Sequence, residues 1–143
     1  MKITIDGPAG SGKSTVAKLL AEKLAFFYID SGSLYRAFAW ALDYFKIDDE
    51  MIDDFAKKFV VNYEWKNKKA NLWVDGKDIS DEIRTQEISN KASLIAKLGS
   101  VRALITDLQR KIGAENNIVI EGRDAGTFVF PEAEIKFFLT ASI

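Results

Sequence analysis

The chain has 143 residues, 48% apolar and 29% charged, which is enough for one soluble globular domain with its own core. Lys and Arg number 20 and Asp and Glu 21, so the net charge of −1 argues against a protein that binds a nucleic-acid polymer over its whole surface. The absence of cysteine excludes disulfides and thiolate metal sites, and the absence of histidine removes the commonest general base. Any chemistry must therefore use Lys, Arg, carboxylates, hydroxyls and backbone amides.

The first half of the chain predicts strands alternating with helices. Residues 2–5 indicate a strand that enters a glycine-rich loop, and apolar residues then recur at helical spacing over 16–24. Residues 26–30 indicate a second, buried strand, residues 34–45 a second helix, and residues 51–59 a short third helix. The phenylalanines of these helices are expected in the core: Phe38, Phe45, Phe55 and Phe59.

The pattern changes near residue 60. Val61, Tyr63 and Trp65 alternate with polar residues, and a second apolar run ends at an Asp75-Gly76 turn, which predicts a small antiparallel ribbon. Two helices are expected next, over 86–98 and 101–113. Gly99 suits the end of the first helix and Ser100 the N-cap of the second.

Residues 117–124 and 134–142 indicate two further buried strands. Strands alternating with helices predict an α/β fold with a parallel sheet covered on both faces. We expect one domain over 1–143, with a core over 1–58 and 99–143 and an inserted lobe over about 59–98. No apolar run approaches the roughly 20 residues of a membrane-spanning helix, and the N-terminus has no apolar signal-peptide core, so a cytoplasmic protein is expected.

Residues 7–15 read GPAGSGKST and match the phosphate-binding pattern G-x-x-x-x-G-K-[ST] at every fixed position. Glycines let successive backbone amides converge on an anion, and the first turn of the following helix adds its positive dipole end. In this pattern Lys13 reaches the β and γ phosphates of a nucleotide, and the hydroxyl of Ser14 binds Mg²⁺. The loop lacks the third glycine of a dinucleotide fingerprint, which disfavours NAD.

Two polar strings follow predicted strands, at the sheet edge where ligands gather in α/β folds. In DSGSLYR (30–36), Arg36 falls one turn into the next helix, although a capped helix with a solvated arginine explains this string equally well. In EGRD (121–124), Glu121 stands where P-loop enzymes have an acid that assists Mg²⁺, and Arg123 offers a planar fork for a phosphate. The clustering of these charges favours a functional site over a solvated turn.

Five strings occur in order along the chain: GPAGSGKST, DSGSLYR, DISDEIRTQEIS, VR at 101–102, and EGRDAGTFVFPEAEIKFFLTAS. Together they resemble the bacterial cytidylate (CMP) kinases, a P-loop nucleoside-monophosphate kinase family, over essentially the whole chain. The resemblance implies a parallel core sheet and a nucleoside-monophosphate lobe enlarged by a small antiparallel sheet. The ribbon near 60–80, predicted from alternation alone, matches that enlargement.

The resemblance also implies roles for individual residues. The ATP phosphates would be held by Gly7, Pro8, Ala9, Gly10, Ser11, Gly12, Lys13, Ser14 and Thr15, with Mg²⁺ on Ser14. The CMP site would comprise Ser31, Arg36, Ser93, Arg102, Arg123 and Asp124. Lys13, Arg36 and Arg123 would act in catalysis by clamping the phosphates. Ser93, Arg102 and Asp124 would read cytosine, because a carboxylate accepts from its amino group while Arg and Ser donate to its ring nitrogen and carbonyl.

The chain departs from the family pattern in two places. Glu121 occupies a position where the family more often has Asp, so its part in holding Mg²⁺ is expected to be indirect. The family also continues beyond this chain's last residue into a lid, a last strand and a last helix, which carry contacts to the ribose and the transferred phosphate. We therefore expect impaired turnover from the chain alone.

The sequence thus predicts an ATP- and Mg²⁺-dependent kinase that converts CMP or dCMP to CDP or dCDP, acting on free nucleotides as a cytoplasmic monomer without membrane or nucleic-acid partners. One alternative is a P-loop kinase with another small acceptor, such as shikimate or a different nucleotide. A second is a nucleotide-binding switch, although the chain has no NKxD-like motif after a strand. A third is a short nucleotide-binding protein without turnover.

Overall fold

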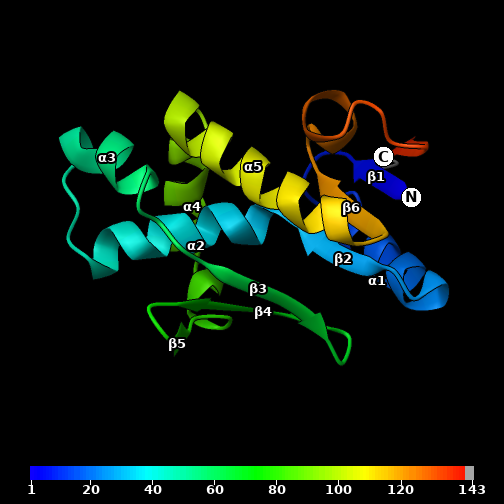
Figure 1. The fold of residues 1–143 in the computed structure, drawn as a ribbon, viewed down its shortest axis with the longest axis horizontal. Helices are drawn as coiled ribbons and strands as arrows, with labels where there is room; N and C mark the ends of the chain where they lie inside the picture. Colours follow the sequence, from blue (N-terminus) through cyan, green and yellow to red (C-terminus); the bar gives the residue numbers. More distant parts are fainter. Residues whose placement is uncertain (141–143) are drawn as a thin grey trace. The chain divides into compact units, whose positions relative to one another are not determined.

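A computed structural model describes residues 1–140 of the protein, and Figure 1 labels the helices and strands. The chain divides into two units. Among the described residues, unit 1 comprises 1–31 and 108–140, and unit 2 comprises Gly32–Asp107. Each unit is described by itself. The lobe predicted over about 59–98 lies wholly inside unit 2 and stays a prediction.

Unit 1 is built on a parallel sheet with the strand order β2-β6-β1-β7. Its strands are β1 (Lys2–Asp6), β2 (Phe27–Asp30), β6 (Ile118–Gly122) and β7 (Ile135–Phe138). Asp6 is paired with Gly122 and Asp30 with Glu121, so three strands end at the same level. The glycine loop, Ser31 and the Arg123 turn therefore all begin at one edge of the sheet.

The two inner strands of this sheet are buried on both faces. Residues 3–6 of β1 and 118–121 of β6 are all buried, as expected for a parallel sheet that is covered on each side. The α/β fold class with a parallel sheet is thus confirmed. The prediction of a buried strand over 134–142 is wrong in its burial and length, because β7 is exposed at all four residues and forms the edge of the described sheet. Ala141 and Ser142 lie outside the described residues.

Helix α1 (Lys13–Leu24) confirms the predicted helix after the glycine loop, but its buried face differs from its most apolar one. Its buried side chains are Ala17 and Ala21, whose small size lets the helix approach β6 closely. Three of its larger apolar residues are exposed: Val16 by 44%, Leu19 by 52% and Leu24 by 42%. The helix ends at Ala25, which adopts the left-handed conformation (φ 56°) and donates its amide to the last turn.

In unit 2, the long helix α2 (Ser31–Tyr44, whose first residue belongs to unit 1) is followed by a 3₁₀ turn (Asp49–Met51) and the short helix α3 (Ile52–Ala56). The predicted aromatic core is confirmed for Phe38 and Phe59, which are buried, whereas Phe55 is half-buried. The Phe38 ring lies 5.5 Å from Phe55 and 5.1 Å from Phe59, between ring centroids. Phe45 contacts the same cluster but is 40% exposed, so it borders the core.

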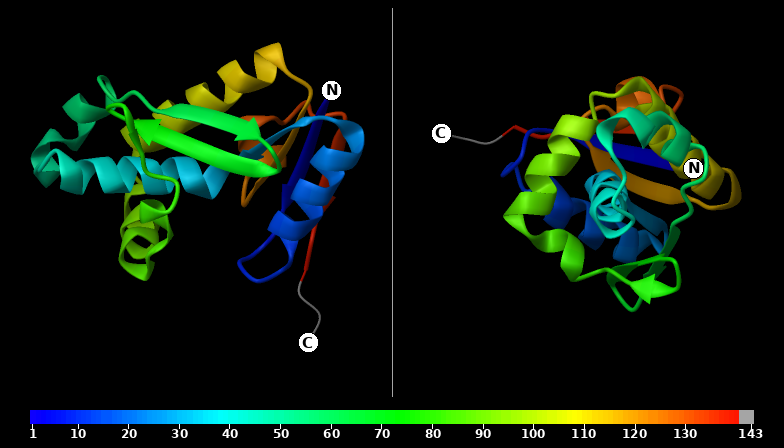
Figure 2. Two further views of the ribbon diagram at one scale, coloured as in Figure 1. Left: turned by 90° about the horizontal axis from the view of Figure 1, so that it is seen from below. Right: turned by 90° about the vertical axis from the view of Figure 1, so that its left-hand side faces the viewer.

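The predicted antiparallel ribbon is confirmed, with its two longer strands side by side in Figure 2, and it gains a third strand, labelled β5 in Figure 1. Strands β3 (Asn62–Lys66), β4 (Lys69–Val74) and β5 (Lys77–Asp78) are joined by two two-residue turns. All four turn residues have positive φ, 54° and 63° at Asn67-Lys68 and 53° and 74° at Asp75-Gly76, as hairpin turns that follow the strand twist require. Alternate residues of β4 are buried, which places one face of the ribbon on the core of unit 2.

Two helices complete the fold: α4 (Gln86–Ile95), preceded by a 3₁₀ turn (Glu82–Arg84), and α5 (Gly99–Glu115). Thr85 caps α4 by accepting a hydrogen bond from the amide of Ile88 at 3.2 Å. The predicted cap at Ser100 is wrong: α5 already begins at Gly99, and the Ser100 hydroxyl donates to Asp53 at 2.6 Å. No helix among residues 1–140 is long and apolar enough to cross a membrane.

Candidate functional site

The glycine-rich loop follows β1 directly and ends in the first turn of α1. Gly10 and Gly12 have φ of 78° and 84°, a conformation that side chains with a Cβ rarely adopt. A Cβ on Gly7 would lie 2.6 Å from the backbone oxygen of Leu139, so this position also excludes any larger residue. The Ser11 hydroxyl is buried without a hydrogen-bond partner among the described residues, which fits a loop whose polar groups serve a ligand.

Two side chains from different elements donate hydrogen bonds to one carboxylate at the end of β6. Glu121, at the end of β6, is 3% exposed. The hydroxyl of Ser14 in α1 donates to it, lying 2.7 Å from Oε1 and 2.8 Å from Oε2. The phenol of Tyr28 in β2 donates to Oε1 at 2.5 Å. A P-loop hydroxyl and an acid at a strand end are therefore hydrogen-bonded to each other in the fold, a contact that the sequence did not predict.

The charge state of Glu121 reflects opposing influences. Burial raises the pKa of its carboxyl, and the nearby negative charge of Asp30 raises it further. The hydrogen bonds from Tyr28 and Ser14 and the positive charge of Lys13 act in the opposite direction but are weaker. Lys13 is thus close enough to influence this carboxylate.

A second buried carboxylate supports the turn after β6. Asp6, the last residue of β1, is 6% exposed and accepts the backbone amides of Ala125 and Gly126, each at 2.8 Å, one on each oxygen. Those amides open a turn of π-helix (Ala125–Val129) that sequence periodicity did not predict. The turn begins directly after Arg123 and Asp124, so Asp6 fixes the backbone next to both.

The remaining predicted site residues fall into both units. In unit 1, Arg123 is exposed, Asp124 is half-buried, and the hydroxyl of buried Ser31 donates to Gln109. In unit 2, Arg36 and Arg102 are half-buried, and the exposed Ser93 donates its hydroxyl to the backbone oxygen of Ser89 at 3.1 Å. The structure thus brings Ser14 together with Glu121 at the end of the sheet, while Arg36, Ser93 and Arg102 belong to the other unit.

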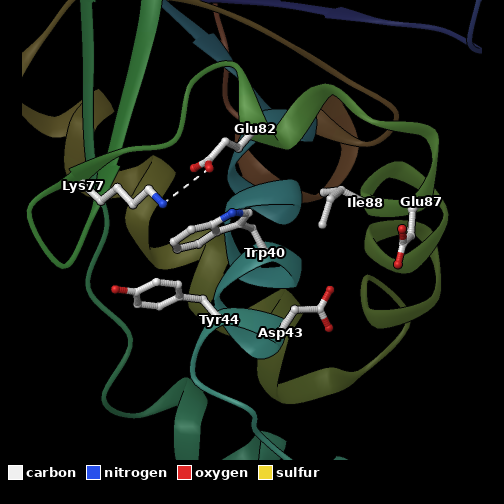
Figure 3. A pocket seen from close by; sticks show the side chains of 7 residues that line it. All are labelled: Trp40, Asp43, Tyr44, Lys77, Glu82, Glu87 and Ile88. Atoms are coloured by element: carbon white, nitrogen blue, oxygen red, sulfur yellow. Dashed lines mark ion pairs between the residues drawn. The ribbon is translucent and has the colours of Figure 1, made fainter.

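Unit 2 also contains a cavity of about 370 Å³ (Figure 3). It is lined by Trp40, Asp43, Tyr44, Lys77, Glu82, Glu87 and Ile88. The rings of Trp40 and Tyr44 stack with their centroids 4.6 Å apart. The ammonium of Lys77 lies 5.7 and 5.8 Å from these centroids and 3.4 Å from the Glu82 carboxylate. The Lys77 ammonium therefore already occupies the face of these two aromatic rings. None of the predicted site residues lines the cavity.

A cavity of about 350 Å³ in unit 1 lies at the opposite end of the sheet from the glycine loop. Its lining includes Lys2 at the start of β1 and Glu134, which immediately precedes β7. Arg110 on its wall is engaged, donating to the backbone oxygens of Val129 and Phe128 at 3.1 Å each. Ligands of open parallel sheets bind at the carboxyl ends of the strands, so the glycine-loop edge is the better candidate.

A divalent metal fits the glycine-loop edge of the sheet only if a bound nucleotide supplies further ligands to it. Residues 1–140 contain no cluster of three or more His, Cys, Asp or Glu side chains able to hold a metal ion. The oxygens of Ser14 and Glu121 are hard donors of the kind that Mg²⁺ prefers, and Mg²⁺ usually keeps several waters and uses substrate phosphates as further ligands. The residues present therefore fit a Mg²⁺ that arrives with a nucleotide.

Comparison with known proteins decides the family. A model of the family described as cytidylate kinase matches residues 3–143. The chain belongs to the cytidylate kinase family. It is 43% identical to the cytidylate kinase of Clostridioides difficile (strain 630) over 98% of the chain, and 45% identical to that of Caldanaerobacter subterraneus subsp. tengcongensis over the whole chain. It is also 46% identical over 99% of its length to part of the bifunctional pantoate ligase/cytidylate kinase of Prochlorococcus marinus (strain MIT 9215).

The chain spans less than two thirds of its single-function relatives. It covers 64% of the C. difficile protein and 63% of the C. subterraneus protein, and 28% of the bifunctional P. marinus protein. The predicted family resemblance is thus confirmed along the chain. Membership of this family agrees with a nucleoside-monophosphate kinase-like fold, and the parallel sheet and the small antiparallel sheet are consistent with that fold.

Two contributors to this edge were missed by sequence reasoning. Tyr28 lies in an apolar run that predicts only a buried strand. The one clue to its role in the sequence is that a buried phenol needs a hydrogen-bond partner. Asp6 directly precedes the glycine loop, where a carboxylate next to a phosphate site has no evident purpose until its two amide partners are seen.

Proposed function

We propose that this chain provides the donor and acceptor sites of a kinase that transfers the γ-phosphoryl group of ATP to CMP or dCMP. The observation that carries the proposal is the family match over residues 3–143, which runs through both the glycine loop and the EGRD turn. Relatives named cytidylate kinase align over 98% or more of the chain. The net charge of −1 argues against a nucleic-acid polymer bound over the whole surface, and a cytoplasmic monomer stays our expectation.

On the donor side, residues 7–15 would hold the ATP phosphates with backbone amides and the Lys13 ammonium. The hydroxyl oxygen of Ser14 would bind Mg²⁺. Glu121 would act indirectly, by accepting a hydrogen bond from that hydroxyl. The 2.7 and 2.8 Å contacts between Ser14 and Glu121 support this division of roles. When bound, Mg²⁺ neutralises charge on the transferring phosphate.

On the acceptor side, Arg36 and Arg123 would clamp the phosphate of CMP, because a guanidinium matches the geometry of phosphate oxygens. Asp124 would accept from the cytosine amino group, with Ser93 and Arg102 donating to the ring nitrogen and carbonyl. Uracil has a carbonyl in place of that amino group and would face an ionised Asp124 unpaired. Ser31 would assist at the start of α2. The lobe over about 59–98 would carry part of this site.

The reaction needs no covalent enzyme intermediate and no histidine. An oxygen of the CMP phosphate is already an anion and forms the new bond to the γ-phosphorus, while the bond to the oxygen that bridges the β and γ phosphates breaks and ADP leaves. The chain's contribution is alignment of donor and acceptor and neutralisation of charge. This chemistry agrees with a sequence that has no histidine and no cysteine.

A turnover assay with a panel of acceptors tests the proposal. We would extend the chain at its C-terminus with the matching segment of the C. difficile relative and measure ADP release with CMP, dCMP, UMP, AMP and dTMP. CMP and dCMP should be the best acceptors, and Asp124→Ala should lose the preference for cytosine over uracil. Preference for AMP or dTMP, or an unchanged cytosine preference in Asp124→Ala, would refute the base assignment.

The second candidate is a chain that binds nucleotide without useful turnover, and the chain spans 64% of the length of the C. difficile relative. Measuring ATP binding and turnover on the 143-residue chain beside the extended chain separates the two. We expect both to bind ATP and only the extended one to turn over efficiently. Full turnover by the 143-residue chain would exclude this second candidate.

A further inference from the structure

The carboxylate of Glu121 is held from two sides. Its Oε1 accepts a hydrogen bond from the Tyr28 phenol at 2.5 Å and lies 2.7 Å from the Ser14 hydroxyl. Its Oε2 lies 2.8 Å from the same Ser14 hydroxyl. The three residues come from β2, β6 and α1. They form a hydrogen-bonded row from the buried sheet to the first turn after the glycine loop.

The register of the sheet explains why the phenol reaches this carboxylate. Tyr28 is paired with Val119 on β6, and Glu121 lies two residues beyond Val119. Residues two apart on a strand share a face, so Tyr28 and Glu121 are diagonal neighbours, within reach of long side chains. Tyr28 is fully buried, at 0% exposed, and a buried phenol needs a polar partner. Glu121 supplies it.

The hydrogen bonds among Tyr28, Glu121 and Ser14 orient the Ser14 hydroxyl. A hydroxyl has one proton to donate and two lone pairs to offer, and here the proton is directed to Glu121. The lone pairs are then left for a hard cation on the other side of the oxygen. A glutamate without a second donor would have three torsions with which to turn away from Ser14, whereas the Tyr28 phenol fixes one of its oxygens.

We propose that Tyr28 is a positioning residue, which holds Glu121 so that the Ser14 hydroxyl is oriented to receive Mg²⁺ together with ATP. This inference rests on the donor half of the proposed function and deepens it. Tyr28 touches neither nucleotide nor metal in this role. Its effect passes through Glu121 to Ser14, so it should appear only when the metal is present.

The test is the affinity of the 143-residue chain for ATP, measured by calorimetry with Mg²⁺ and again in EDTA. Tyr28→Phe keeps the ring in the core and removes only the hydroxyl. We expect it to weaken ATP binding in Mg²⁺ by about tenfold, the lower end of the range for partners that support a metal ligand. ATP binding in EDTA should stay within about twofold of the original chain. Tyr44→Phe, on an exposed tyrosine of unit 2, is the matched control and should change neither value.

A double-mutant cycle tests the path of the effect. In a Ser14→Ala background, Tyr28→Phe should cause no further loss in Mg²⁺, because the hydroxyl that it orients is gone. A further tenfold loss there would overturn the proposal, as would an unchanged affinity in the single variant. An equal loss in Mg²⁺ and in EDTA would show that Tyr28 supports the loop or the fold instead. If the original chain binds no ATP at all, the proposed function itself fails, and the two failures are thereby distinguished.

Discussion

Replacing Asp6 with asparagine should loosen the turn that follows β6. In the native chain, one carboxylate oxygen accepts the amide of Ala125 and the other accepts the amide of Gly126, each at 2.8 Å. Asparagine has nearly the same shape but offers one oxygen and one NH₂ group. One amide therefore keeps a weaker, neutral partner, and the other faces a donor.

The size of the effect follows from burial and charge. Asp6 is 6% exposed, so water cannot readily replace the lost acceptor. A hydrogen bond to a charged group contributes about 1.5–3 kcal/mol, and a buried donor left unpaired costs a similar amount. We therefore expect the free energy of unfolding to fall by about 2–3 kcal/mol. The fall should be large compared with that of Asp107→Asn, an exposed aspartate on α5, which should stay within about 0.5 kcal/mol.

Two measurements check this prediction. Urea unfolding gives the free-energy difference, and hydrogen exchange followed by NMR reports on the amides of Ala125 and Gly126 directly. In Asp6→Asn at least one of these two amides should exchange faster than in the original chain. The exchange rates of amides in the middle of α1 should change only by the amount that the change in global stability accounts for. Unchanged exchange at both amides, together with unchanged stability, would refute the role that we assign to Asp6.

Three further outcomes are expected. Lys13→Ala should reduce turnover of the C-terminally extended chain by about 100-fold or more with an unchanged circular dichroism spectrum, and retained turnover would remove the lysine from the mechanism. Gly126→Ala should lower the free energy of unfolding by about 1–3 kcal/mol, because its Cβ would lie 2.6 Å from a threonine oxygen of β1, whereas Gly99→Ala meets nothing within 4 Å and should be neutral. The Ser80 hydroxyl and amide lower the pKa of Asp78, so the stability that ionised Asp78 contributes is present above its unfolded pKa of about 3.9 and is lost as pH falls through the folded value. The stability gap between the original chain and Asp78→Asn should thus be wider at pH 7 than at pH 3, and a gap that is constant with pH would contradict this.

Local signals predicted the elements of the fold well, because they rest on short-range physics. The glycine loop needs positive φ at Gly10 and Gly12, and only glycine adopts it readily, so the sequence itself indicates the loop. Asp75-Gly76 similarly predicts a tight hairpin turn, and the structure has one. The position of Glu121 at the ligand edge followed from parallel strands ending together.

Burial was predicted less well, because it depends on which surface an element meets. Helix α1 buries Ala17 and Ala21 and exposes Leu19, since close packing on β6 favours small side chains over large ones. Hydrophobicity alone ranks these residues in the opposite order. The same limit applies to β7, whose apolar residues indicated a buried strand although Phe138 is 68% exposed.

The supporting polar residues were beyond sequence reasoning for a related reason. Asp6 and Tyr28 act on partners more than 90 residues away along the chain. Such partners are fixed by strand order and register, which no local pattern encodes. The order β2-β6-β1 places Tyr28 beside Glu121, and it places Asp6 beside the turn after β6. Each residue becomes meaningful only when its neighbour in the sheet is known.

The glutamate at position 121 shows how register can offset a change in side-chain length. The family resemblance leads us to expect aspartate more often at this place, and the extra methylene of glutamate moves the carboxylate further from the backbone. In this chain the longer side chain still lies within 2.8 Å of the Ser14 hydroxyl, and the phenol of Tyr28 in β2 fixes one of its oxygens. Shortening the arm by Glu121→Asp, with Tyr28 left in place, should therefore break one of the two hydrogen bonds. ATP affinity in Mg²⁺ should fall while affinity in EDTA is retained, and an unchanged affinity in Mg²⁺ would show that the length of this side chain is immaterial to the donor site.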